Sequence, residues 1–135
     1  FIYNGLSDEV QTLDFIGQWS KEKTFYLPVV KDSGLILREY NTDVQLTKSS
    51  YGIMEPEGND FSDYEKIDLI IIPGMAFDRQ KSRLGKGKGF YDHLLPTIKA
   101  TKVGICFDFQ LYDKIPSVEN DVKMDYIISE NELFW

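Results

Sequence analysis

Apolar residues in this chain fall into short runs that polar turns separate. Three segments contain apolar residues at successive positions, which is typical of strands covered on both faces of a sheet. These runs are residues 69–72, 103–107 and 125–129. Apolar side chains also recur at helical spacing from the polar residues 7–9 to about Ser20. A second helix is predicted from about Gly89 to Leu95, because Pro96 ends or kinks it.

The first half of the chain is predicted to add shorter strands. Residues 1–4 favour a short strand. Residues 24–30 and 35–40 flank a turn at residues 32–34, so the pair is predicted to form a hairpin. Residues 41–66 show little periodicity, and no element is predicted there.

Helices that alternate with fully apolar strands predict the α/β class, with a sheet covered on both sides. At 135 residues the chain is long enough for a single domain with one core, residues 1–135. Connections between parallel strands are right-handed. The loops that follow residues 72 and 107 are therefore expected at the same edge of the sheet.

The composition excludes several classes of protein. A hydrophobic content of 42% and an aromatic content of 14% exclude intrinsic disorder. No apolar run approaches the ~20 residues that span a membrane. A net charge of −7 argues against a nucleic-acid partner, which requires a broad basic face. The single cysteine, Cys106, lies inside an apolar run, which predicts a reduced core residue in a cytoplasmic protein.

A basic, glycine-rich loop follows the first of the apolar runs. It holds five of the chain's 15 Lys and Arg residues within ten positions: Arg79, Lys81, Arg83, Lys86 and Lys88. Its glycines, at positions 85, 87 and 89, let backbone N–H groups approach phosphate oxygens, and the cations neutralise phosphate charge. A following helix start adds its positive dipole end. Asp92, three residues after the last glycine, is suitably placed for a magnesium ion that bridges phosphates.

Simpler interpretations of these residues remain open. A G-x-G-x-G loop is often a solvated turn, and this one is neither a P-loop nor the dinucleotide fingerprint. The strand before it, the density of positive charge and the aromatic and acidic residues 90–92 favour phosphate binding. Asp78 is expected to be structural and to bond Arg79 or Arg83. His93 is expected on the surface, because neighbouring side chains on a helix diverge.

Two segments resemble a known family. They are Asp68 to Asp78, DLIIIPGMAFD, and Arg83 to Asp92, RLGKGKGFYD. Weaker matches follow in the same order along the chain, at residues 8–12, 51–56, 103–109, 119–122 and 125. Together they cover nearly the entire chain. On these motifs, the sequence resembles the 5-formyltetrahydrofolate cyclo-ligase family, also called methenyltetrahydrofolate synthetases.

The resemblance implies a fold, a reaction and two further ligands. The fold is a three-layer α/β/α sandwich with a mostly parallel central sheet, like that of sugar-phosphate isomerases and coenzyme A transferases. The reaction converts 5-formyltetrahydrofolate and ATP to 5,10-methenyltetrahydrofolate, ADP and phosphate, and it uses Mg²⁺. In that chemistry the formyl oxygen is phosphorylated first, N10 then attacks the activated carbon, and phosphate leaves.

The resemblance also implies roles for individual residues. The ATP loop comprises Arg83, Leu84, Gly85, Lys86, Gly87, Lys88, Gly89, Phe90 and Tyr91, of which Arg83, Lys88 and Tyr91 are expected to be catalytic. The reduced folate is expected to contact Asn4, Glu9, Gly87, Lys88, Gly89 and Phe90. Glu9 would hydrogen-bond the pterin, and Asn4 would act through its backbone. Asp92 and Asp121 are expected to hold magnesium. From the residues alone, Glu9 is better explained as a first-turn helix acid and Asp121 as a turn cap.

One part of the family pattern is missing. The family's first helix carries a cationic pair, K/R-x-x-x-R, that contacts ATP phosphates and would precede Phe1. We therefore expect the native protein to have a helix that this chain lacks. Loss of one such contact would weaken ATP binding by ~1.5–3 kcal/mol.

Two other functions stay open beside the ligase. One is a non-catalytic folate- or nucleotide-binding member of the family. The other is a sugar-phosphate isomerase on the same fold, which would need a carboxylate base near the substrate. We expect a monomer that binds small molecules, without nucleic-acid or membrane partners.

Overall fold

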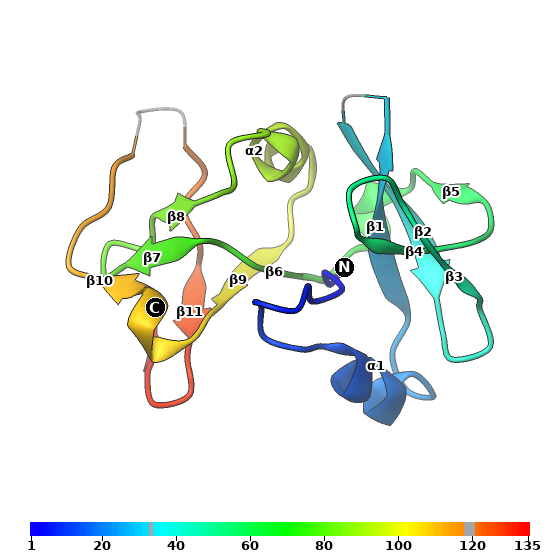
Figure 1. Cartoon of the computed structure of the whole chain (residues 1–135), viewed down its shortest axis with the longest axis horizontal. Coiled ribbons are helices and arrows are strands. Elements are labelled where there is room, and N and C mark those ends of the chain that lie inside the picture. Colours follow the sequence, from blue (N-terminus) through cyan, green and yellow to red (C-terminus); the bar gives the residue numbers. More distant parts are fainter. Residues whose placement is uncertain (33, 118–120) are drawn as a thin grey trace.

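The computed structural model describes residues 1–32, 34–117 and 121–135 (Figure 1). Its strands are β1 (Phe25–Lys31), β2 (Gly34–Tyr40), β3 (Leu46–Lys48), β4 (Met54–Pro56), β5 (Asp60–Phe61), β6 (Leu69–Ile72), β7 (Ala76–Asp78), β8 (Arg83–Leu84), β9 (Thr101–Ile105), β10 (Leu111–Tyr112), β11 (Tyr126–Ile128) and β12 (Leu133–Phe134). Its helices are α1 (Leu13–Trp19) and α2 (Phe90–Leu94), with 3₁₀ turns η1 (Tyr64–Lys66), η2 (Leu95–Thr97) and η3 (Asp108–Gln110). Within these ranges, no helix is long and apolar enough to cross a membrane. Residue 33 of the predicted turn and residues 119–120 of the weaker family match lie outside the described residues.

The centre of the molecule is a sheet with the strand order β12-β11-β9-β6. Strands β6, β9 and β11 run parallel, and β12 pairs antiparallel with β11. These parallel strands are the three apolar runs, so the predicted α/β class and its mostly parallel sheet are confirmed. Strand β9 begins and ends two residues before its predicted limits.

The first residues of the chain join this sheet to the N-terminal hairpin. Ile2 forms a parallel bridge with Ile71 of β6, and its N–H donates to the carbonyl of Tyr26 in β1 at 3.0 Å. In Figure 1 the N-terminus accordingly lies between β6 and β1. The strand predicted at residues 1–4 is reduced to this single bridge. The predicted hairpin is confirmed as the antiparallel pair β1–β2, which β5 extends.

Several strands of two or three residues were not predicted. Strands β3 and β4 pair antiparallel inside residues 41–66, where the sequence indicated no element. Strand β7 pairs antiparallel with β8 and parallel with β10, so the first part of the basic loop is a hairpin. Strands this short show no period in their side chains, and only the hydrogen bonds to their partner strands define them.

The first helix is shorter than its sequence pattern predicts. It begins at Leu13 instead of residues 7–9. Tyr3 Oη donates to the Val10 carbonyl at 2.7 Å, and Thr12 Oγ1 donates to the Tyr3 carbonyl at 2.8 Å. These long-range bonds hold residues 7–9 outside the helix.

Two apolar clusters form the core, one on each face of the central sheet. Side chains alternate along a strand, so Ile70 and Ile72 enter one cluster while Ile71 packs against the other. Helix α2 contributes Leu94 to the first cluster, and α1 contributes Ile16 to the second. Helices of seven and five residues do not make complete layers in the described part of the chain. The three-layer sandwich therefore stays a prediction.

Two positions test the predicted burial of β6 and of Cys106. Leu69 of β6 is 42% exposed, because it lines an open apolar groove together with Phe15 and Trp19. The expected cover on both faces of this strand is thus wrong at its first residue. Cys106 is a free, buried thiol, as predicted, and burial raises its pKa to about 12. The thiol is therefore protonated and unreactive at neutral pH.

Candidate functional site

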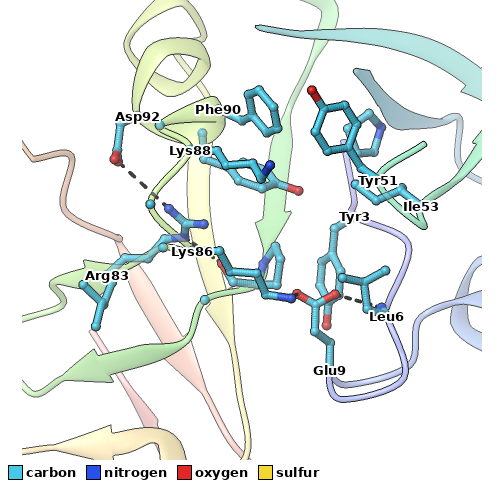
Figure 2. A pocket seen from close by; sticks show the side chains of 18 of the residues that line it. Tyr3, Leu6, Glu9, Tyr51, Ile53, Arg83, Lys86, Lys88, Phe90 and Asp92 are labelled. Atoms are coloured by element: carbon cyan, nitrogen blue, oxygen red, sulfur yellow. Dashed lines mark hydrogen bonds and ion pairs between the residues drawn. The ribbon is translucent and has the colours of Figure 1, made fainter. Parts of the chain in front are cut away.

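A cavity of about 300 Å³ opens beside the glycine-rich loop (Figure 2). Its wall includes residues 83–92, Asn4 and Glu9 from the start of the chain, and Asp121 from a distant loop. These are all of the residues predicted for the nucleotide, folate and magnesium sites. The structure brings them together in one cavity, and their roles toward ligands stay predictions.

The backbone of the loop depends on glycine at two positions. Gly87 and Gly89 have φ angles of 92° and 72°, in the left-handed region that residues with a Cβ rarely adopt. Gly89 is the N-cap residue of α2. Helix α2 has only five residues, so few peptide dipoles add along it. An anion here would be held by the loop's own N–H groups and cations more than by the helix dipole that the sequence suggested.

Arg83 is held in place at the wall of the cavity. Its side chain is 7% exposed, and its Nε donates to the Pro73 carbonyl at 2.6 Å. Its guanidinium lies 4.7 Å from the centre of the Tyr91 ring. Burial lowers the pKa of Arg83, and nearby acidic groups partly oppose this shift. A guanidinium stays protonated at any physiological pH, so Arg83 supplies a permanent charge in a fixed position.

The Tyr91 phenol is partly buried between Arg83 and Phe1. Its ring stacks on that of Phe1, with centroids 6.1 Å apart. Burial raises the pKa of Tyr91 well above its usual range. The phenol is therefore protonated at neutral pH, and it is suited to donate a hydrogen bond but not to act as a base.

Glu9 lies in the cavity wall and not in the first turn of a helix, so that interpretation is wrong. Its Oε1 accepts a hydrogen bond from the Leu6 N–H at 2.8 Å, and its side chain is only 10% exposed. Lys86 Nζ lies 3.9 Å from Glu9 Oε2 and 3.8 Å from Asp8 Oδ1. A largely buried carboxylate, fixed by a backbone bond, thus faces the cavity.

Asn4 is buried beside Glu9 in the same wall. Its Nδ2 donates to the carbonyl of Met54 in β4 at 3.4 Å. The side-chain amide therefore has a partner within the protein, and the expected contact between the Asn4 backbone and the folate stays a prediction.

Lys88, Phe90 and Tyr51 gather at the end of the cavity away from Glu9 (Figure 2). Lys88 Nζ lies 4.6 Å above the centre of the Tyr51 ring, and the Tyr51 and Phe90 rings meet edge-on at 5.9 Å. Tyr51 belongs to the loop between β3 and β4. Its segment is one of the weaker family matches, but the sequence does not predict its place in the cavity. The available signal was an aromatic residue in a loop beside glycine.

Asp92 and Asp121 both line the cavity. The Asp92 side chain is 53% exposed, and its Oδ1 lies 4.0 Å from Arg83 Nη1. Among the described residues, no three His, Cys, Asp or Glu side chains gather in the way that an all-protein metal site requires. Two carboxylates fit magnesium, which commonly takes one or two of them and completes its shell with water and phosphate oxygens.

Two predictions about neighbouring polar residues have opposite outcomes. His93 is exposed, as predicted. Asp78 bonds neither Arg79 nor Arg83, so that expectation is wrong. Its carboxylate instead accepts backbone N–H groups, because it is buried at the end of β7 and faces the turn that follows.

The cavity wall also includes residues to which the sequence gave no role. They are Tyr3, Leu6, Pro28, Ile53, Pro73, Gly74 and Pro116. They are mostly apolar and come from five separate parts of the chain. Pro73, Gly74 and Ile53 lie in segments that match the family, but nothing in the local sequence places any of these residues in the cavity wall, and only the fold brings them there.

A profile of the 5-formyltetrahydrofolate cyclo-ligase family matches residues 1–130. The chain belongs to this family. The 5-formyltetrahydrofolate cyclo-ligase of Escherichia coli is 30% identical over 142 residues, which cover 98% of this chain and 78% of the relative. The probable 5-formyltetrahydrofolate cyclo-ligase of Schizosaccharomyces pombe is 31% identical over 144 residues, covering 93% of this chain and 71% of the relative.

Solved structures of cyclo-ligases share the fold. The 5,10-methenyltetrahydrofolate synthetase of Aquifex aeolicus superposes with a TM-score of 0.85 at 34% identity, covering 98% of this chain and 68% of that protein. The enzyme of the same name from Mycoplasma pneumoniae gives a TM-score of 0.73 at 28% identity, covering 94% and 71%. The mixed α/β fold and the family suggested by the motifs are therefore both confirmed.

Proposed function

We propose that the protein is a 5-formyltetrahydrofolate cyclo-ligase, which converts 5-formyltetrahydrofolate and ATP to 5,10-methenyltetrahydrofolate, ADP and phosphate. Family membership supports the substrate class. One observation carries the proposal: a single cavity unites the cationic glycine loop, Glu9 and two carboxylates. Phosphoryl transfer needs the acceptor, the phosphates and the metal in one place, so this union suits the reaction.

The proposed reaction has two bond-forming steps. The formyl oxygen bonds to the γ-phosphorus of ATP while the bond to ADP breaks. N10 then attacks the activated formyl carbon, the carbon–oxygen bond breaks as phosphate leaves, and N10 loses its proton. The protein has little covalent chemistry to perform, so its residues act by positioning the reactants and neutralising charge.

Arg83, Lys86 and Lys88 are assigned to the phosphates in this proposal. Arg83 is held by its contacts with Pro73 and Tyr91. Lys86 instead lies near the Glu9 carboxylate, and Lys88 lies over the Tyr51 ring. Those contacts are partly exposed and weak, about 0–1 kcal/mol each, so the two ammonium groups are free to move to a more highly charged partner at low cost. The N–H groups of the glycine loop complete the anion site.

Asp92 and Asp121 would hold the magnesium ion, which when bound supplies positive charge that neutralises and orients the phosphate oxygens. The partial exposure of Asp92 suits a ligand that shares the ion with water and phosphate. Its carboxylate lies next to the Arg83 guanidinium, so both charges would act on the same phosphates.

Glu9 is assigned to the pterin. Its carboxylate is fixed by the Leu6 N–H and accepts hydrogen bonds, while a pterin ring presents N–H donors. The rings of Phe90 and Tyr51 supply an apolar wall for a flat, partly aromatic ligand.

The direct test follows methenyltetrahydrofolate by its near-ultraviolet absorbance, with the full-length protein, 5-formyltetrahydrofolate, ATP and Mg²⁺. Conversion is expected, with one ADP released per product, and omission of ATP or addition of a chelator abolishes it. Thermal stabilisation by the folate without any conversion would instead support the non-catalytic binder. Conversion without ATP would contradict the proposed mechanism.

A further inference from the structure

One buried carboxylate outside the cavity, that of Asp78, is fully engaged with backbone amides. Asp78 is 1% exposed and ends β7. Its Oδ1 accepts the N–H of Gln80 at 3.0 Å and that of Ser82 at 2.9 Å, which closes the anchor turn, residues 78–82. Its Oδ2 accepts the N–H of Ile115 at 3.1 Å. One side chain therefore joins its own turn to a segment 37 residues away.

The loop that carries Asp121 is tied to the anchor turn on both of its sides. Before Asp121, the tie is the Ile115 N–H on the Asp78 carboxylate. After it, the Met124 N–H donates to the Lys81 carbonyl at 2.9 Å. Lys81 has a φ of 67°, a left-handed conformation that costs about 1 kcal/mol outside glycine. The anchor turn thus holds Lys81 in a strained conformation, and the carbonyl of Lys81 accepts the hydrogen bond from the Asp121 loop.

The other end of the anchor turn leads directly to the glycine loop. Arg83 follows the turn and pairs with Phe77 across the β7–β8 hairpin. The Met75 N–H donates to the Leu84 carbonyl at 2.7 Å, at the last position before the glycines. The anchor turn is therefore the common support of the phosphate loop and of the loop that carries Asp121.

The hydrogen bonds by which Asp78 connects the anchor turn to Ile115 are called the joint below. The chemistry of this joint requires a carboxylate. Both oxygens of Asp78 accept N–H groups, whereas an amide side chain would offer one acceptor and one donor. An asparagine that kept its oxygen toward Ser82 would turn its NH₂ toward the Ile115 N–H, donor against donor. Burial alone would raise the pKa of Asp78, but the backbone donors and the charge of Lys123 outweigh it, and the pKa lies below its ordinary value. The group is therefore ionised at neutral pH.

We propose that Asp78 is a positioning residue: its carboxylate holds the loop of Asp121 against the hairpin that carries the glycine loop, and so sets the spacing between the magnesium ligand and the phosphate-binding residues. This inference rests on the proposed function of the cavity. It assigns to Asp78 no contact with substrate, nucleotide or metal.

The test measures binding of Mg²⁺ with a non-hydrolysable ATP analogue by calorimetry, and the Michaelis constants for ATP and for the folate, in the full chain with Asp78→Asn. Affinity for the magnesium–nucleotide pair is expected to fall by about 10-fold, the low end of the loss seen when a group bonded directly to a metal ligand is removed, because Asp78 acts on Asp121 only through the loop backbone. The Michaelis constant for the folate should change by less than about twofold, because Glu9 and Leu6 are not part of the joint. An equal loss for both ligands would indicate general destabilisation and overturn the inference.

Glu55→Gln is the matched control. Glu55 also accepts a backbone N–H, that of Val30 at 2.6 Å, but it joins β4 to β1 and does not line the cavity. This change should alter thermal stability without altering magnesium–nucleotide affinity. A similar loss of affinity in Glu55→Gln and Asp78→Asn would contradict a specific role for Asp78.

A second variant keeps the test decisive if Asp78→Asn does not fold. Lys123 donates to the Ser82 hydroxyl and ties the far side of the Asp121 loop to the same turn, and Lys123 is exposed. Lys123→Met should therefore fold and lower magnesium–nucleotide affinity by a few fold with an unchanged folate constant. An unchanged affinity in this variant would contradict the positioning role of the anchor turn.

Amide hydrogen exchange separates failure of this inference from failure of the proposed function. In Asp78→Asn, or in Lys123→Met, exchange should accelerate at Ser82 and Met124 in the free protein, and for Asp78→Asn also at Ile115. That readout needs no ligand. Faster exchange together with a wild-type protein that binds no nucleotide would overturn the ligase assignment and the positioning role, but not the structural joint. Unchanged exchange would overturn the joint itself.

Discussion

Asp92→Asn is expected to lower kcat/KM for ATP by on the order of 100-fold or more with little change in stability. The variant keeps the shape of the side chain but removes the charge that would hold magnesium, and a bound metal contributes several kcal/mol of charge stabilisation. Asp92 is 53% exposed and its nearest cation, Arg83, is 4.0 Å away, so the fold loses little. The measurement is steady-state turnover at varied Mg²⁺ and ATP, with thermal unfolding alongside.

Asp63→Asn is the control for this result. Asp63 has a similar exposure, 51%, and also lies near a cation, Lys66 at 3.3 Å, but it lies outside the cavity wall. Its replacement should leave turnover unchanged. Wild-type turnover in Asp92→Asn, with the same dependence on Mg²⁺, would remove Asp92 from the proposed metal site.

Lys88→Met is expected to reduce kcat/KM for ATP by about 10- to 100-fold, which is the loss expected for one charged hydrogen bond to a phosphate. Methionine keeps most of the unbranched stem that lies over Tyr51, so the change tests the ammonium group more than the packing. The side chain lies in a loop, and no large loss of stability is expected. Turnover at varied ATP and nucleotide binding by calorimetry provide the measurement.

Lys99→Met serves as the comparison, because Lys99 is exposed and does not line the cavity. It should bind nucleotide as the parent protein does. If Lys88→Met and Lys99→Met behave alike, general surface charge and not the glycine loop governs nucleotide binding.

The parts of the fold that were predictable are those with a local signal. Strands β6, β9 and β11 lie side by side in the central sheet, and each has a buried middle, so each contains apolar residues at successive positions. Tyr126 and Ile128 of β11 are nevertheless exposed, as Leu69 of β6 is, so the predicted cover on both faces is incomplete. The glycine loop was recognisable because a turn with φ angles of 92° and 72° requires glycine, and its cations are adjacent in sequence. The same proximity in sequence explains why residues 83–92 were expected to act together.

The parts that were missed depend on distant partners. The start of α1 was misplaced because Tyr3 and Thr12, nine residues apart, replace helical bonds with a contact of their own. Asp78 was given the wrong partner because the Ile115 amide comes from 37 residues away. Tyr51 reaches Lys88 and Phe90 only because the β3–β4 loop folds over the glycine loop. In each case the local sequence shows which residue is present but not which residue it contacts in the folded chain.

The central claim is that the glycine loop binds the phosphates of ATP beside a folate held at Glu9. A crystal structure of the protein with Mg²⁺, a non-hydrolysable ATP analogue and 5-formyltetrahydrofolate tests it most directly. We expect phosphate oxygens within hydrogen-bonding distance of the amides of residues 85–89 and of the Lys88 ammonium group. We also expect the ion to bind Asp92 and Asp121, and the pterin to lie against Glu9. A nucleotide bound elsewhere, with the glycine loop in contact only with solvent and the folate bound away from Glu9, would contradict this claim.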